Sequence, residues 1–202
     1  MRSSTSKRPR SIARTVVLAM CVTLCTMGLT SPAMAWSQLK NGGGTGACSP
    51  CIEWSQTNAT YYLDSPITGH SAWPGYIATD IQVYNNVSSA TNPTFARTYG
   101  TGDVTFSAKS LDAKLCGTTY EYADPRHSTI IVSGTVYLST NQTYYRTGGT
   151  PTACHFDGTI LHEFGHASGL GHSTHSNAVM WPTINPYTAL KSDDVAGIQA
   201  IY

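Results

Sequence analysis

The stretch from His162 to His172 constrains the fold of this chain more than any other, because it reads H-E-x-x-H-x-x-G-x-x-H. On an α-helix of about 3.6 residues per turn, the spacing of His162 and His166 places both imidazoles on one face. Gly169 then stands where a helix often ends through a residue at positive φ, which glycine adopts without strain. The chain can turn back there and bring His172 to the same point. The pattern therefore predicts a helix ending at Gly169 and a metal site with three imidazole ligands.

The residue after the first histidine, Glu163, indicates what such a metal would do. It is offset by roughly 100° around the helix from His162, so its carboxylate can flank the metal without binding it. Three nitrogen ligands leave the fourth tetrahedral position of zinc to water, which is typical of a catalytic zinc. We therefore expect one catalytic Zn2+ held by His162, His166 and His172, with Glu163 as general base.

The N-terminal residues 1–35 differ from the rest of the chain and read as an export signal. Basic side chains precede an apolar run from Val16 to Leu29, and Ala33-Met34-Ala35 matches the small-x-small pattern that signal peptidase cleaves. An uncleaved membrane anchor is the alternative, but the run is shorter than the ~20 apolar residues of a spanning helix. We expect cleavage before Trp36, and hence a secreted protein without a stable membrane anchor.

Removal of residues 1–35 changes the charge of the protein. They carry five of the 12 basic side chains and none of the 11 acidic ones, so residues 36–202 have a formal net charge of −4, against +1 for the whole chain. No cluster of Lys or Arg remains there, which argues against a nucleic-acid partner.

The length of 202 residues suits one domain with a buried core. We expect a monomer.

Four cysteines follow the signal segment: Cys48, Cys51, Cys116 and Cys154. An even number of cysteines in an exported chain favours disulfides, and four allow three pairings. The closeness of Cys48 to Cys51, and the position of Cys154 just before the metal helix, favour Cys48–Cys51 with Cys116–Cys154. A metal clip at Cys48 and Cys51 is the alternative, although no second C-x-x-C or nearby histidine pair completes it.

The rest of the sequence predicts a single catalytic domain over residues 56–202, preceded by a flexible N-terminal arm over the polar, glycine-rich residues 36–55. β-branched and aromatic runs predict strands, and apolar residues at three- and four-residue spacing predict helices. The expected strands are 60–63, 95–99, 104–107, 118–122 and 129–138, the expected helices are 72–84, 158–169 and one with Ser192 as its N-cap, and residues 141–157 form a surface loop. This order predicts an α+β fold with a twisted, mostly parallel sheet, an active-site helix and a C-terminal helix.

The metal-binding motif at 162–172 and the turn around Met180 after it resemble the metzincin metallopeptidases. Their detailed residue pattern is similar to that of the matrixin family, the matrix metalloproteinase-type branch. Ser173 directly follows the third histidine, as is usual in matrixins, and Met180 comes soon after it. Pro182 stands where astacin-like and serralysin-like relatives carry a tyrosine ligand. Residues 190–202 are similar to the family's C-terminal helix almost position by position. The resemblance is strong over residues 157–202 and only topological before them.

The resemblance implies a metzincin fold and a secreted zinc-dependent endopeptidase with protein or peptide substrates. It assigns zinc binding to the three histidines and the role of base to Glu163, and it makes Met180 the apolar floor beneath the metal. Asp193 and Asp194 match a largely structural pair of carboxylates that anchors neighbouring backbone. By family order, an extended substrate would pair with the strand at 118–122.

Three departures limit this comparison. The family's P-R-C-G-x-x-D switch is missing, so the usual control of latency is not expected. Its structural zinc and calcium motifs are not recognisable, which leaves calcium binding open. His127 and His155, near Asp124 and Asp157, are candidate remnants, but loop histidines on a polar surface are the preferred interpretation. Ile184 stands where the wall of the specificity pocket usually carries tyrosine, so pocket preference is not carried over.

A zinc-stabilised extracellular binding protein or inhibitor without proteolysis is the alternative function. Glu163 argues against it, since loss of the base is the usual mark of an inactive site. If the third metal ligand were not His172, His175 would be the first candidate to replace it. The loop position of His175 favours a solvated side chain.

Overall fold

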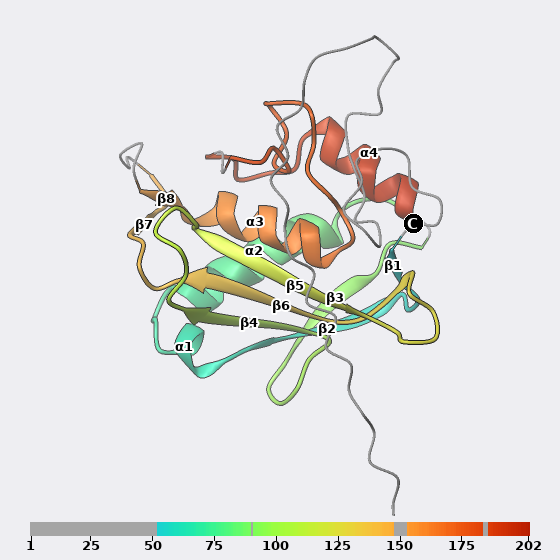
Figure 1. Cartoon of the computed structure of the whole chain (residues 1–202), viewed down its shortest axis with the longest axis horizontal. Helices are drawn as coiled ribbons and strands as arrows, with labels where there is room; N and C mark the ends of the chain where they lie inside the picture. Colours follow the sequence, from blue (N-terminus) through green and yellow to red (C-terminus); the bar gives the residue numbers. More distant parts are fainter. Residues whose placement is uncertain (1–51, 90, 148–152, 184–185) are drawn as a thin grey trace, which may run out of the picture.

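The computed structural model describes residues 52–89, 91–147, 153–183 and 186–202 (Figure 1). The strands of its main sheet are β1 Glu53–Trp54, β2 Asn58–Leu63, β3 Thr94–Thr98, β4 Val104–Lys109, β5 Gly117–Ala123 and β6 Ile130–Ser139. β5 pairs with β6 in antiparallel fashion at one edge of the sheet. All other pairings, from β6 through β4 and β2 to β3, and from β1 to β6, are parallel. The strands predicted from residue 95 onward each overlap an observed strand, and the mostly parallel sheet confirms the predicted fold class.

The helices of the described residues are α1 Ser65–Thr68, α2 Trp73–Asn85, α3 Phe156–Ala167 and α4 Ser192–Ile201. α2 and α3 pack against each other and against the sheet, and α4 lies on the far side of α3 from the sheet (Figure 1). The ring of Phe164 on α3 lies 5.0 Å from Tyr84, 4.8 Å from Phe95 and 5.9 Å from Phe106, measured between ring centroids. This buried aromatic cluster fixes α3 against the sheet. No helix in the described ranges combines the length and apolar character needed to cross a membrane.

The predicted helix at 72–84 matches α2 within one residue at each end. Its buried residues Ile77, Ile81 and Tyr84 share one stripe, as the apolar spacing indicated. The short helix α1 was not predicted, because the sequence indicated only a strand that ends at residue 63. The Asp64 side chain accepts a hydrogen bond from the backbone N–H of Ser65 and thereby caps α1.

The predicted N-terminal arm at 36–55 extends too far, since its last residues belong to the folded domain. β1 pairs with β6, and Trp54 is only 4% exposed. Trp54 Nε1 donates a hydrogen bond of 2.8 Å to the carbonyl oxygen of Ala167, so β1 also holds the end of α3. β1 is thus the first strand, ahead of the predicted one at 60–63. Residues 1–51, with the signal segment, the start of the arm, Cys48 and Cys51, lie outside the described residues.

In the segment predicted as a surface loop, 141–157, the described residues 141–147 and 153–157 form more regular structure and are more buried than expected. It contains a two-stranded parallel pairing of β7 Tyr144–Tyr145 with β8 Cys154–His155. A disulfide joins Cys116, just before β5, to Cys154, with the Cα atoms 5.7 Å apart. The interpretation as loop histidine on a polar surface is wrong for His155, which is 5% exposed. His127, by contrast, is exposed.

Candidate metal centre

Helix α3 carries the first two histidines of the motif, and its N-terminal end is held by polar contacts. Nδ1 of His155 accepts a hydrogen bond of 3.0 Å from the backbone N–H of Gly158, so this histidine is the N-cap. Asp157 in the first turn is buried and accepts from Nε of Arg146 at 2.7 Å. Its charge also suits the positive end of the helix dipole. His155 and Asp157 therefore serve to start α3, a role that sequence reasoning missed.

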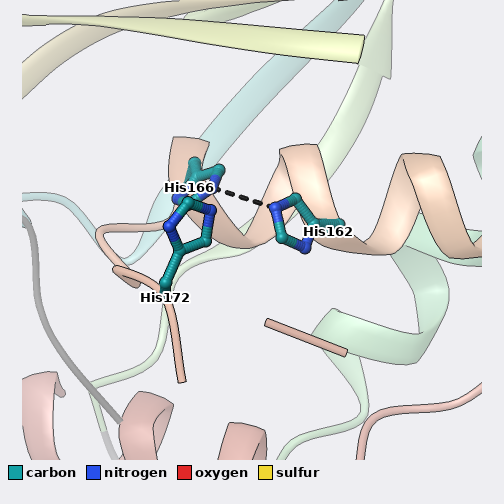
Figure 2. A group of neighbouring side chains, drawn as sticks. All are labelled: His162, His166 and His172. Atoms are coloured by element: carbon teal, nitrogen blue, oxygen red, sulfur yellow. Dashed lines mark hydrogen bonds between the residues drawn. The ribbon is translucent and has the colours of Figure 1, made fainter. Parts of the chain in front are cut away.

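The imidazoles of His162, His166 and His172 converge on one point (Figure 2). One ring nitrogen from each lies within 4.8 Å of the others, and the Nε2 atoms of His162 and His166 are 3.2 Å apart. Two nitrogen ligands at ~2.0 Å from a tetrahedral zinc lie ~3.3 Å apart, so this spacing fits a shared zinc ion. Within the described part of the chain, no second group of three His, Cys, Asp or Glu side chains is placed to hold a metal.

Backbone carbonyl groups set the orientation of two of these rings. Nδ1 of His162 lies 2.9 Å from the carbonyl oxygen of Val179, and Nδ1 of His166 lies 2.8 Å from that of Leu170. A carbonyl oxygen can only accept, so Nδ1 carries the proton in both rings. Nε2 is then deprotonated and suited to bind a metal.

Burial keeps the three imidazoles uncharged near neutral pH. It lowers the pKa of His162 to about 4 and also lowers the pKa of His172. The pKa of His166 falls well below its usual value, because of burial first and of the two neighbouring histidines second. Neutral imidazole is the form that coordinates metal ions, so the site needs little proton release on binding.

Gly169 reverses the chain after α3 and returns the third histidine to the site. The helix itself ends at Ala167, and Gly169 adopts a φ of 90° two residues later. Its N–H donates a hydrogen bond of 2.8 Å to the carbonyl oxygen of His166. A Cβ at this position would lie 2.6 Å from the carbonyl oxygen of Ile52. Both the backbone conformation and the space require glycine here, and the reversed chain brings in His172.

Met180 lies directly against the helix segment between the first two histidines. It is 1% exposed, and its Sδ leaves no room for a Cβ on Gly165. The carboxylate of Asp194 accepts hydrogen bonds from the backbone N–H groups of Val179 at 2.9 Å and of Met180 at 3.0 Å. Asp194 thus ties the segment around Met180 to the start of α4.

Helix α4 starts one residue earlier than predicted, because Ser192 was the predicted N-cap. Lys191 is the N-cap, Ser192 is the first helical residue, and Asp194 Oδ2 accepts from the backbone N–H of Lys191 at 2.8 Å. Asp193 accepts from the hydroxyl of Ser173 at 2.6 Å and lies 3.2 Å from Nδ1 of His175. His175 is therefore engaged with Asp193 and is not grouped with the three converging imidazoles. Pro182 is exposed. Ile184, the other position that the sequence comparison singled out, lies outside the described residues.

Glu163 is buried between α3 and the edge strand β5. It is 5% exposed, and its Oε2 accepts a hydrogen bond of 2.7 Å from the hydroxyl of Thr119. Burial raises the pKa of Glu163 to about 7, although the bond from Thr119 lowers it and the nearby Glu121 raises it further. A carboxyl group with such a pKa can accept and release a proton near neutral pH.

Sequence reasoning did not identify the residues of β5 that contact Glu163. The predicted strand at 118–122 was the expected substrate strand, but nothing in its residue types indicated that Thr119 bonds the carboxylate. Gly117 is also part of this contact, since a Cβ there would lie 2.7 Å from Cγ of Glu163. Both contacts join residues more than 40 positions apart, and only the folded sheet brings them together.

Comparison with known proteins gives matches over the region that forms this domain. The profile of the matrixin family, Peptidase_M10, matches residues 53–202. Matrix metalloproteinase-19 of Homo sapiens is 34% identical over 108 residues, covering 51% of this chain and 21% of that protein. Matrix metalloproteinase-19 of Mus musculus is 29% identical over 155 residues, covering 74% of this chain and 29% of that protein. Matrix metalloproteinase-20 of Homo sapiens is 60% identical over 45 residues, covering 20% of this chain and 9% of that protein. The matches span less than a third of each relative's own length.

Proposed function

Because this chain belongs to the matrixin family, we propose that it is a zinc-dependent metalloendopeptidase that hydrolyses internal bonds of proteins or peptides. The observation that carries the proposal is the convergence of three neutral imidazoles next to a buried glutamate, Glu163. The relatives reported above are named matrix metalloproteinases, which supports the same reaction class. As the chain spans less than a third of their length, activity is inferred for the domain at 53–202.

His162, His166 and His172 would hold the zinc ion. When bound, zinc supplies Lewis-acid chemistry that activates water and polarises a carbonyl group. Glu163 acts as general base through Oε1, because its Oε2 is held by the hydroxyl of Thr119. The carboxylate takes a proton from the attacking water and later gives it to the leaving amine nitrogen. One side chain thus serves first as base and then as acid.

Strand β5 is the element best suited to bind an extended substrate. It lies at the edge of the sheet, and its residues Gly117 and Thr119 contact Glu163. An edge strand offers backbone N–H and C=O groups to an added strand. A peptide paired there would lie beside the proposed base.

We further infer that the protein acts outside the cytosol as a monomer. It binds no nucleic acid, and it keeps no membrane anchor after cleavage before Trp36. Support comes from the signal-like residues 1–35 and from the net charge of −4 that their removal leaves. The inferred substrates are proteins or peptides.

The test is a cleavage assay on the protein expressed from the whole sequence and purified, with casein and quenched fluorescent peptides as substrates. Cleavage should stop when a chelator removes zinc and return when zinc is added back. Glu163→Gln should bind one zinc per chain yet lose about 10²- to 10⁴-fold in kcat, since it removes the base and keeps the ligands. Zinc bound without cleavage of any substrate would favour the non-proteolytic binding protein or inhibitor.

A further inference from the structure

Strand β5 carries a third side chain, Glu121, on the face that contacts Glu163. The side chain of Thr119 is directed toward α3, and so would be a Cβ at Gly117, as the contacts of both positions with Glu163 show. The register of β5 with β6 is regular as far as Tyr122. Side chains on one face of a strand recur at every second residue, so Glu121 also faces α3.

The pairing of β5 places Glu121 beside the last turn of α3. Glu121 pairs with Gly134 of β6, and a Cβ on Gly134 would lie 3.8 Å from Cβ of Ala167. Ala167 is the final residue of α3, one turn after Glu163. Glu121 therefore lies further along β5 than Thr119, on the C-terminal side of the proposed base.

Glu121 is half-buried and has no basic partner among the described residues. The salt bridges found there join Arg146 to Asp157 and His175 to Asp193. Burial raises the pKa of Glu121 to about 7, and its carboxylate raises that of Glu163. Ionisation of a carboxyl group that is shielded from water and has no cation beside it costs free energy. A cation that binds next to it would lower this cost.

The free side of β5 is where such a cation could arrive. On an added strand, the side chain directly opposite Glu121 would share its face, with Cβ atoms about 4.5–5.5 Å apart. The side chain opposite Thr119 would be two residues away along that strand, at ~7 Å, beside Glu163. A basic side chain opposite Glu121 would therefore be close to the bond that is cut.

We propose that Glu121 is a specificity-determining residue that selects substrates with Lys or Arg two to three residues from the scissile bond. The proposal rests on the proposed endopeptidase function. The carboxylate attracts the basic side chain, and it disfavours Asp or Glu at the same position because like charges directly opposite each other are destabilising. The substrate class is thus a basic peptide segment in extended conformation.

The test measures kcat/KM for matched quenched peptides that differ at one position, with Lys in one and Gln in the other. Each of three positions on either side of the scissile bond is varied in turn, at pH 8. The full chain should prefer Lys by about five-fold at one position two or three residues from the cut, which is the size of a partly shielded ion pair. The remaining positions should show ratios near one.

Glu121→Gln should abolish that preference, and Glu121→Lys should replace it with a preference for Glu over Gln. Glu53→Gln is the matched control, because it also removes one carboxylate charge from a half-buried strand residue. It should keep the Lys preference. Thermal unfolding of each variant establishes that it is folded, and raised salt with the unaltered chain should reduce the Lys-to-Gln ratio independently of any variant.

The outcomes separate this proposal from the proposed function. Cleavage with the same Lys-to-Gln ratio in the unaltered chain and in Glu121→Gln overturns the role of Glu121 and leaves the endopeptidase intact. A fall in kcat/KM of Glu121→Gln that is equal for the Lys and the Gln peptide also overturns it. Glu121 would then act through Glu163 and not on the substrate side chain. Absence of cleavage of every peptide by the zinc-loaded chain overturns both proposals.

Discussion

The hydroxyl of Thr119 lies 2.7 Å from Oε2 of Glu163 and 2.8 Å from the carbonyl oxygen of the same residue. A hydroxyl has one proton to donate, so the two acceptors share it. The contact joins the edge strand β5 to helix α3 and restricts the rotamer of the proposed base. In this way the sheet orients a carboxylate whose position on the helix alone would leave it free to move.

Replacement of Thr119 should affect turnover more than substrate binding. Thr119→Val removes the hydroxyl at nearly constant volume, and we expect kcat to fall about ten-fold with KM little changed, because the base is less well positioned. Thr119→Ser keeps the hydroxyl and should restore most of the rate. Steady-state kinetics on a quenched peptide measure both. Equal kcat in the Val and Ser variants would show that the hydrogen bond has no positioning role.

Gly117→Ala should displace Glu163 by direct contact. The added Cβ would lie 2.7 Å from Cγ of Glu163 and 3.0 Å from Cγ2 of Thr159. Both distances are shorter than the usual contact between non-bonded carbon atoms. We expect at least ten-fold lower kcat with zinc content unchanged. Gly75→Ala is the matched control, because nothing lies within 4 Å of a Cβ there, and it should retain normal kcat. A fully active Gly117→Ala would mean that β5 yields easily and does not constrain the base.

The metal ligands were predictable because their arrangement depends on residues that are close together in the sequence. The four-residue spacing of His162 and His166 follows from helix geometry, and Gly169 has a backbone conformation that its residue type favours. Thr119 and Glu121 were not predictable, since their proximity to Glu163 depends on strand pairing across the sheet. His155 was misplaced for a different reason, because a histidine in a polar segment gives no sign that its ring caps a helix and is buried.

Burial of Asp80 on α2 should make the stability of the domain depend on pH. Asp80 is 2% exposed, its Oδ2 has no hydrogen-bond partner within the described structure, and burial raises its pKa to about 8, with Asp157 adding to the rise and Arg146 opposing it. The unfolded chain, with a carboxyl pKa of ~3.9, releases this proton at lower pH than the folded protein. The contribution of Asp80 to stability should therefore be greatest at and below about pH 4 and should fall as the pH rises toward 8.

Asp80→Asn removes the ionisation and should raise the free energy of unfolding by about 2 kcal/mol at pH 9, with little effect at pH 4. Urea unfolding monitored by circular dichroism at both pH values measures the difference. Asp112→Asn serves as control, because Asp112 is exposed, and its effect should be small at either pH. A stabilisation by Asp80→Asn of equal size at pH 4 and pH 9 would contradict the assignment to ionisation.

Loss of the third imidazole should weaken zinc binding far more than loss of its neighbour in sequence. His172 converges with His162 and His166, whereas the exposed His175 lies 3.2 Å from Asp193. His172→Ala leaves two nitrogen ligands, and we expect zinc affinity to fall by at least 100-fold, because each zinc–imidazole bond contributes several kcal/mol. His175→Ala should keep one zinc per chain. Equilibrium dialysis against a competing chelator, followed by metal analysis, gives both affinities. Full zinc occupancy in His172→Ala together with loss in His175→Ala would require the chain after Gly169 to rearrange when zinc binds.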